Sequence, residues 1–184
     1  LPWRLLRPVG VSASIRCPVI VVVYGGPGVR RVNNEWLTPW HHYMTSQGYA
    51  IFQLDNRGSA DRGRDFESPI YGHLGDIEVR DQLLGVRYLQ SLDEIDSNRI
   101  GVFGHSYGGY MTLMLLMKSP GTFKCGISVA PVTDWGLYDT HYTERYLGLP
   151  SDNKAGYEAS SVFPYTSALS DPLLLIHEIG SAHV

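Results

Sequence analysis

A serine flanked by glycines is the group in this chain best suited to chemistry. Gly104, Ser106 and Gly108 form a Gly-x-Ser-x-Gly pattern between apolar runs at 99–103 and 111–117. A strand, this pattern and a helix make a nucleophile elbow, a turn so tight that glycine is needed on both sides of the serine. Backbone N–H groups and the helix dipole favour an oxyanion there. The pattern therefore predicts Ser106 as a nucleophile with an exposed hydroxyl on a strained turn, although it also occurs in ordinary loops.

Tyr24 is a candidate to assist this serine. It ends an apolar run and precedes Gly-Gly-Pro-Gly at 25–28. Lipase-like hydrolases often carry His-Gly-Gly at this place, and its backbone N–H groups bind the oxyanion. The Tyr24 hydroxyl could supply one hydrogen bond to an oxyanion, with a second from the backbone N–H of Tyr107. The alternative is an aromatic residue that packs on the core at the end of a strand.

Two other loops also follow predicted strands. Trp135, Tyr138 and Tyr142 are spaced three to four residues apart, which predicts that they share one helical face. That face could line an apolar specificity pocket beside the serine, or it could pack on the core. The polar loop at 55–59, Asp-Asn-Arg-Gly-Ser, fits a turn held by its own side chains at least as well as a catalytic role.

Strands and helices must alternate to position these residues. A β-branched apolar run predicts a strand at 18–24, and further mainly apolar runs predict strands at 49–54, 99–103, 125–130 and 173–176. Helical patterns occupy 40–47, 76–92 and 111–117. This alternation predicts an α/β fold, a mostly parallel sheet with helices on both faces. Ligands of such sheets bind at the carboxyl ends of the strands, where Ser106, Tyr24 and the aromatic segment are all expected.

Composition excludes several classes of function. The 184 residues suit one domain, and a net charge of −3 without a basic block argues against binding to nucleic acid or anionic membranes. The sequence contains no run of 18 apolar residues, so it predicts no membrane-spanning helix. Cys17 and Cys125 are too few for a disulfide framework, and their apolar surroundings predict buried thiols. The histidines show no metal-ligand spacing, so we expect no metal and no cofactor.

Four segments in order resemble the catalytic domain of the prolyl oligopeptidase family, in its dipeptidyl-peptidase IV branch. They read Tyr-Gly-Gly-Pro at 24–27, Leu-Asp-Asn-Arg-Gly at 54–58, Gly-His-Ser-Tyr-Gly-Gly-Tyr at 104–110 and Tyr-Thr-Glu-Arg-Tyr at 142–146. The similarity runs from about residue 5 to about residue 177. It implies that residues 1–184 are a partial α/β-hydrolase domain, without the family's N-terminal β-propeller and without the C-terminal end of the domain.

The resemblance also implies an activity and a site. The activity is that of a serine peptidase that removes N-terminal dipeptides with proline or alanine at the second position, through an acyl-enzyme on Ser106. The oxyanion hole would consist of the Tyr24 hydroxyl and the Tyr107 N–H. The pocket for the proline ring would be lined by Tyr107, Val132, Trp135, Tyr138 and Tyr142. The substrate would be a peptide, and the parent protein a periplasmic or otherwise extracytoplasmic homodimer, although the residues themselves do not fix the compartment.

The chain departs from the family pattern at its two ends. It begins with Leu1 and has no signal-peptide pattern, so we expect that its start has been removed. The triad acid and histidine should follow the last strand. Residues 177–184 read His-Glu-Ile-Gly-Ser-Ala-His-Val, with Ser181 and Ala182 where two aspartates are expected. We therefore expect the chain as given to be inactive, as a fragment of an active peptidase or as a degenerate α/β-hydrolase domain.

The residues present offer poor substitutes for the missing acid and histidine. Glu178 is an acidic candidate, but it lies about three positions early. His105 adjoins the serine, yet an elbow turns neighbouring side chains away from the nucleophile. The other histidines precede the serine, lie in the aromatic segment or follow the last strand, at His41, His42, His73, His141, His177 and His183. A small esterase is a third alternative, which Tyr24 in place of His-Gly-Gly disfavours.

Overall fold

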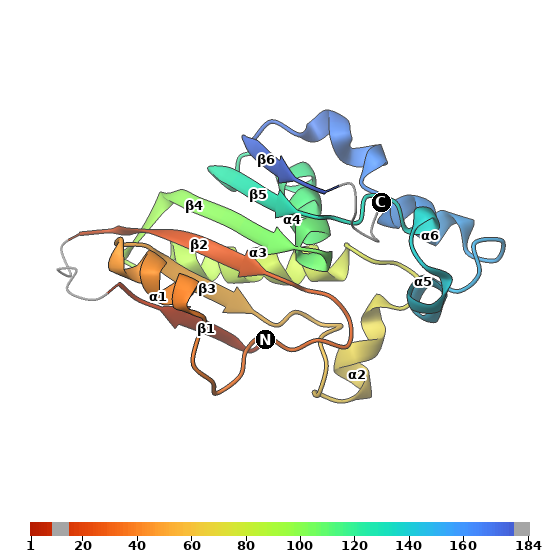
Figure 1. Ribbon diagram of the computed structural model, residues 1–184, viewed down its shortest axis with the longest axis horizontal. Helices are drawn as coiled ribbons and strands as arrows, with labels where there is room; N and C mark the ends of the chain where they lie inside the picture. The colour runs from red at the N-terminus through yellow and green to blue at the C-terminus, as the bar shows by residue number, and fades with distance from the viewer. Residues whose placement is uncertain (9–14, 179–184) are drawn as a thin grey trace.

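The computed structural model describes residues 1–8 and 15–178. The described residues form a six-stranded sheet in the order β1-β3-β2-β4-β5-β6 (Figure 1). The strands are β1 (Trp3–Leu6), β2 (Cys17–Val23), β3 (Ala50–Leu54), β4 (Ile95–His105), β5 (Cys125–Val129) and β6 (Leu173–Ile176). β1 is antiparallel to β3, and every other neighbouring pair is parallel. The predicted α/β fold is confirmed.

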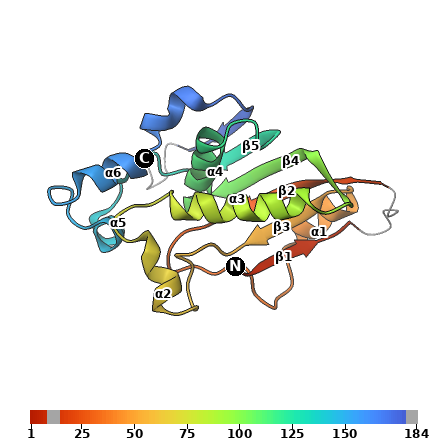
Figure 2. The same cartoon turned by 180° about the vertical axis from the view of Figure 1, so that it is seen from behind.

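Helices cover both faces of this sheet. α1 (Pro39–Ser46) lies on one face, and α3 (Ile77–Gln90) and α4 (Tyr107–Lys118) lie on the other (Figures 1 and 2). The shorter helices α2 (Arg64–Glu67), α5 (Thr140–Leu147) and α6 (Lys154–Ser160) lie beyond the carboxyl ends of the strands. Three 3-10 turns, η1 (Ser68–Ile70), η2 (Trp135–Leu137) and η3 (Phe163–Ala168), complete the described elements. No helix of the described residues has both the length and the apolar character needed to cross a bilayer.

The core lies between the sheet and the α3–α4 layer. Every residue of β3 is buried, including the polar Gln53, as expected for a strand covered on both faces. Residues 107–117 of α4 are all buried as well, because this helix packs between β4, β5 and α3. α4 begins four residues earlier than the apolar run predicted, at Tyr107, directly after the serine.

The two cysteines differ in exposure, so the expectation of two buried thiols is wrong for one of them. Cys17 is buried and Cys125 is exposed. A Cβ added at Gly126 would meet Leu116 of α4, so the neighbouring Cys125 faces the opposite side of the sheet. Among the described residues, the helix on that side is α1, which lies over β2 and β3 and not over β5. An apolar strand sequence alone does not reveal whether both faces are covered.

This difference predicts selective modification of the two thiols. In the folded 184-residue chain, Cys125 should react rapidly with a thiol reagent such as Ellman's reagent. Cys17 should react only after unfolding, because burial excludes the reagent and raises the pKa of its thiol, which lowers the thiolate fraction. Counting the thiols modified before and after denaturant, with Cys125→Ser as the control, tests this. Rapid native labelling of the Cys125→Ser variant would contradict the described packing.

Candidate active site

Ser106 lies on a strained turn between β4 and α4. Its backbone has φ +60° and ψ −119°, outside the regions that non-glycine residues favour. Its N–H donates to the Val129 carbonyl at 2.9 Å, and its own carbonyl accepts from the Tyr110 N–H at 3.0 Å. The residue is partly exposed and directly follows the last residue of β4. The prediction of a strained turn at the end of this strand is confirmed.

Glycines make this turn possible because the backbone packs against itself there. A Cβ at Gly104 would collide with the Gly108 carbonyl, and a Cβ at Gly108 would collide with the Val23 carbonyl at the end of β2. A Cβ at Gly109 would lie 2.6 Å from the Val129 carbonyl oxygen of β5. The glycines therefore bring the start of α4 against the ends of three parallel strands.

Tyr24 and Tyr107 lie close together beside the elbow. Val23, which precedes Tyr24, pairs with Gly104 in the parallel register of β2 and β4. The Tyr24 and Tyr107 rings have centroids 6.0 Å apart. A Cβ at Gly26 would lie 2.7 Å from Cγ of Tyr107 and 2.9 Å from Cε1 of Tyr24, so glycine is needed between these rings. The structure thus brings Tyr24 next to the residue that follows Ser106.

The environment of Tyr24 keeps its hydroxyl protonated. Burial raises the pKa of the Tyr24 phenol above its ordinary value. The Arg31 guanidinium, 4.7 Å from the ring centroid, opposes this shift without cancelling it. At neutral pH the hydroxyl is therefore a neutral donor, which is the state that stabilisation of an oxyanion requires.

The aromatic residues Trp135, Tyr138 and Tyr142 do not share one helix, so that part of the prediction is wrong. Trp135 begins η2, Tyr138 is extended, and Tyr142 lies in α5. Each helix has its own N-cap: the Asp134 carboxylate accepts from the Gly136 N–H at the start of η2, and the Asp139 carboxylate accepts from the Tyr142 N–H at the start of α5, each at 2.8 Å. The single helix expected from the spacing of the rings is therefore replaced by two short helices, each with its own N-cap.

The three rings nevertheless converge. The Trp135 and Tyr142 centroids are 6.0 Å apart with a 16° angle between the planes, and Tyr138 packs edge-on at 5.7 Å from Trp135 and 5.5 Å from Tyr142. Trp135 also contacts Tyr107, with centroids 5.4 Å apart. We call Tyr107, Trp135, Tyr138 and Tyr142 the aromatic cluster. Through Tyr107 it is continuous with the turn that carries Ser106.

The cluster has a buried base and a partly exposed side. Tyr107 and Trp135 are 2% and 1% exposed, and Val132, in the loop after β5, is also buried. Tyr138 and Tyr142 are partly exposed. Trp135 and Tyr107 therefore pack in the core, as one of the two interpretations expected. Tyr138 and Tyr142 keep part of their surface exposed to solvent. This arrangement can hold an apolar group.

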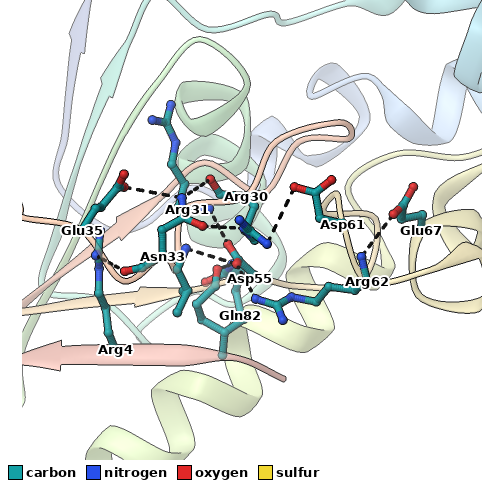
Figure 3. A network of polar contacts seen from close by, with 12 residues as sticks. Arg4, Arg30, Arg31, Asn33, Glu35, Asp55, Asp61, Arg62, Glu67 and Gln82 are labelled. Carbon is teal, nitrogen blue, oxygen red and sulfur yellow. Dashed lines mark hydrogen bonds and ion pairs between the residues drawn. The ribbon is translucent and has the colours of Figure 1, made fainter.

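The polar loop at 55–59 stabilises the segment that follows Tyr24 through hydrogen bonds. Asp55 accepts hydrogen bonds from the Arg31 and Val32 N–H groups at 2.8 and 3.1 Å, and its carboxylate lies 3.3 Å from Arg62 (Figure 3). Asn56 donates to the Gly25 carbonyl at 2.9 Å. These bonds fix the loop that follows Tyr24, and none of them reaches Ser106. The structural interpretation of this segment is the better one.

In the described part of the chain, no acid or histidine side chain is hydrogen-bonded to the serine. Within residues 1–8 and 15–178, no side chain hydrogen-bonds the Ser106 hydroxyl, and no three His, Cys, Asp or Glu side chains gather into a metal site. His105 is exposed. His41 is bonded to Thr38 at 2.6 Å and lines a cavity of about 170 Å³ with Tyr24 and His105.

The segment expected to carry the triad acid is only partly described. His177 is exposed and bonds the Glu178 carbonyl oxygen at 2.9 Å through Nδ1. Ser181, Ala182 and His183 lie outside the described residues.

Glu78 is a residue of this site that the sequence analysis missed. It lies in the first turn of α3 and is 0% exposed. The Tyr107 hydroxyl donates to its Oε1 at 2.8 Å. A signal was present in the sequence, because Glu78 shares a helical stripe with the buried residues Gln82, Gly85 and Leu89.

The backbone crowding at the elbow predicts that alanine substitution at two glycines of β4 will change the free energy of unfolding by very different amounts. Gly104→Ala should lower the free energy of unfolding by about 3 kcal/mol or more, because the neighbouring backbone cannot move away from the methyl group. Gly101→Ala is the matched control: its Cβ would be 3.6 Å from the nearest atom, so the change should stay within about 1 kcal/mol. Urea unfolding of both variants measures the difference. Equal effects would show that the elbow is not crowded as described.

Comparisons with known proteins agree with this geometry. Residues 36–179 match the prolyl oligopeptidase family. The chain is 42% identical over 180 residues to dipeptidyl peptidase 8 of Mus musculus, an alignment that covers 94% of this chain and 20% of the mouse protein. It is 43% identical over 176 residues to dipeptidyl aminopeptidase B of Saccharomyces cerevisiae, covering 94% of this chain and 22% of the yeast protein.

A solved structure extends the comparison to three dimensions. The crystal structure of Porphyromonas gingivalis dipeptidyl peptidase 4 superposes with a TM-score of 0.92 at 39% identity, covering 95% of this chain and 25% of that chain. The sheet and its helices therefore have the α/β-hydrolase fold of that protein. This chain spans about a fifth of the length of the mouse and yeast relatives. The match over most of its residues shows that the chain belongs to the prolyl oligopeptidase family of serine peptidases.

Proposed function

We propose that this chain is the nucleophile-bearing part of a serine dipeptidyl peptidase that releases N-terminal dipeptides with proline or alanine at the second position. The observation that carries the proposal is the continuity between the strained Ser106 turn and the aromatic cluster through Tyr107. A nucleophile and an apolar surface are thereby joined by adjacent residues. The names of the relatives, which are dipeptidyl peptidases, support the same class of reaction.

In the proposed reaction the Ser106 oxygen attacks the carbonyl carbon of the second substrate residue. A general base takes the serine proton and then delivers it to the leaving amine. The tetrahedral oxyanion accepts hydrogen bonds from the Tyr107 N–H, at the N-terminus of α4, and from the neutral Tyr24 hydroxyl. The peptide bond breaks, the dipeptide remains as an ester on Ser106, and water releases it in a second round of the same chemistry.

The aromatic cluster accounts for the proposed preference for proline. A prolyl residue in the substrate has a compact apolar ring and no N–H, so its pocket needs flat apolar surface and no hydrogen-bond partner. Tyr107, Trp135 and Val132 would form the buried base of that pocket. Tyr138 and Tyr142 would form its partly exposed side. Alanine would fit the same space with fewer contacts.

A second proposal concerns the 184-residue chain by itself, which we infer to be catalytically inactive. The supporting observation is that no histidine within residues 1–8 and 15–178 is hydrogen-bonded to the Ser106 hydroxyl. A serine without a general base loses most of its reactivity. In this account a longer protein supplies the acid and the histidine. The other possibility is a degenerate domain that binds peptides without cleaving them.

The protein encoded by the complete gene should hydrolyse Gly-Pro and Ala-Pro anilides. Ser106→Ala should lower its kcat roughly 10⁴-fold or more, because the covalent route is lost. Ser151→Ala, at an exposed serine of the same domain, should leave kcat unchanged. The isolated 184-residue chain should show negligible turnover. A complete protein that cleaves neither anilide would contradict the proposed function, and turnover by the isolated chain above ~1 s⁻¹ would contradict its inactivity.

A further inference from the structure

The proposed reaction leaves a buried carboxyl group next to the elbow without a role. Glu78 Oε1 accepts hydrogen bonds from the Gly75 N–H at 3.0 Å and from the Tyr107 hydroxyl at 2.8 Å. Oε2 is buried and has no hydrogen-bond partner among the described residues. The described ion pairs include none with Glu78. The carboxyl group is therefore held by hydrogen bonds alone.

Tyr107 is the residue through which this carboxyl group can influence the site. Its backbone belongs to the elbow, and its ring packs between Tyr24 at 6.0 Å, Tyr110 at 5.3 Å and Trp135 at 5.4 Å. The far end of the ring is the hydroxyl that Glu78 holds. The ring is thus fixed at one end by the strained turn and at the other end by the first turn of α3.

Burial of the Glu78 carboxyl group in the protein interior is energetically unfavourable. Burial disfavours the charged form and raises the pKa of the Glu78 carboxyl, and the hydrogen bonds from the Gly75 N–H and the Tyr107 hydroxyl oppose this shift without cancelling it. Burial also raises the pKa of the Tyr107 phenol well above its ordinary value. In this contact the Tyr107 phenol is the donor and Glu78 Oε1 is the acceptor. An amide at position 78 could accept the same bond, whereas an apolar side chain could not.

We propose that Glu78 is a positioning residue that fixes the Tyr107 ring against the substrate pocket and thereby sets the preference for proline over alanine at the second substrate residue. A fixed ring limits the width of the pocket, and the proline ring fills that width. The methyl group of alanine makes fewer contacts, so it is less sensitive to a ring that can shift. The inference rests on the proposed dipeptidyl-peptidase function.

The test uses the complete protein and the ratio of kcat/KM for a Gly-Pro anilide to that for a Gly-Ala anilide. The fraction of folded enzyme cancels in this ratio, so a loss of stability alone does not move it. Glu78→Met removes the acceptor, and Glu78→Gln retains it through the amide carbonyl oxygen. Tyr107→Phe removes the donor without changing residue 78. Tyr110→Phe is the matched control. It removes the hydroxyl of another buried tyrosine that contacts Trp135, but this hydroxyl donates to the Ser160 carbonyl and not to Glu78.

Glu78→Met and Tyr107→Phe should each lower the ratio about tenfold, within the range that a pocket contact contributes to discrimination. The double variant should fall no further than the worse single variant, because both changes break one bond. Glu78→Gln and Tyr110→Phe should keep the ratio within about twofold. If Glu78→Met fails to fold, Tyr107→Phe and Glu78→Gln still decide the question.

Other outcomes would overturn the inference. An unchanged ratio in Tyr107→Phe would do so, as would equal losses in Tyr107→Phe and Tyr110→Phe or a tenfold loss in Glu78→Gln. These results would leave the proposed function intact, provided that the unmodified protein cleaves both anilides. An unmodified protein that cleaves neither would reject the function and this inference together.

Discussion

The close approach of backbone to backbone at the end of β4 is the constraint on which the rest of this structure depends. Gly104, Gly108 and Gly109 allow the first turn of α4 to touch the carbonyl groups of Val23 and Val129, at the ends of the two strands that flank β4. Only glycine, which has no Cβ, permits the backbone of α4 to come this close to the two carbonyl groups. Because the helix starts there, Ser106 takes a strained conformation and the Tyr107 N–H lies at the helix N-terminus. Position, strain and electrostatics at the serine thus have one origin.

Tyr107 transmits this constraint to the rest of the site. Its ring contacts Tyr24 across Gly26 and contacts Trp135 at the base of the aromatic cluster. Its hydroxyl reaches Glu78 on α3. Residues from the loop after β2, from α3 and from the segment after β5 therefore meet at a single side chain, which is why a site assembled from distant parts of the sequence can have a defined shape.

Much of the fold could be predicted from the sequence, because its signals are local. Mainly apolar runs indicated β2, β3, β5 and β6, and the glycine pair around Ser106 indicated the elbow. β1 was missed because Trp-Arg-Leu-Leu is short and lacks a clear alternation, and it becomes a strand by pairing with β3. α6 was missed because Lys-Ala-Gly-Tyr-Glu-Ala-Ser has little apolar periodicity.

The candidate site was less predictable, because its errors concern tertiary contacts. The spacing of Trp135, Tyr138 and Tyr142 correctly suggested rings that meet, but a second N-cap at Asp139 starts a new helix within the segment. The exposure of Cys125 depends on which helices cover the sheet, which no local pattern records. Glu78 was on a predictable buried stripe, yet its partner Tyr107 is 29 residues away in sequence. Such a pairing can be read only from the fold.

The central claim is that the elbow makes Ser106 the nucleophile, and a covalent probe tests it most directly. A fluorophosphonate reacts when an activated serine oxygen displaces fluoride from phosphorus. After treatment of the protein encoded by the complete gene, peptide mass spectrometry should find one phosphonyl adduct, on Ser106, at a stoichiometry that matches the loss of anilide hydrolysis. An adduct on a different residue that accounts for the lost activity, or full inhibition with Ser106 unmodified, would contradict this account.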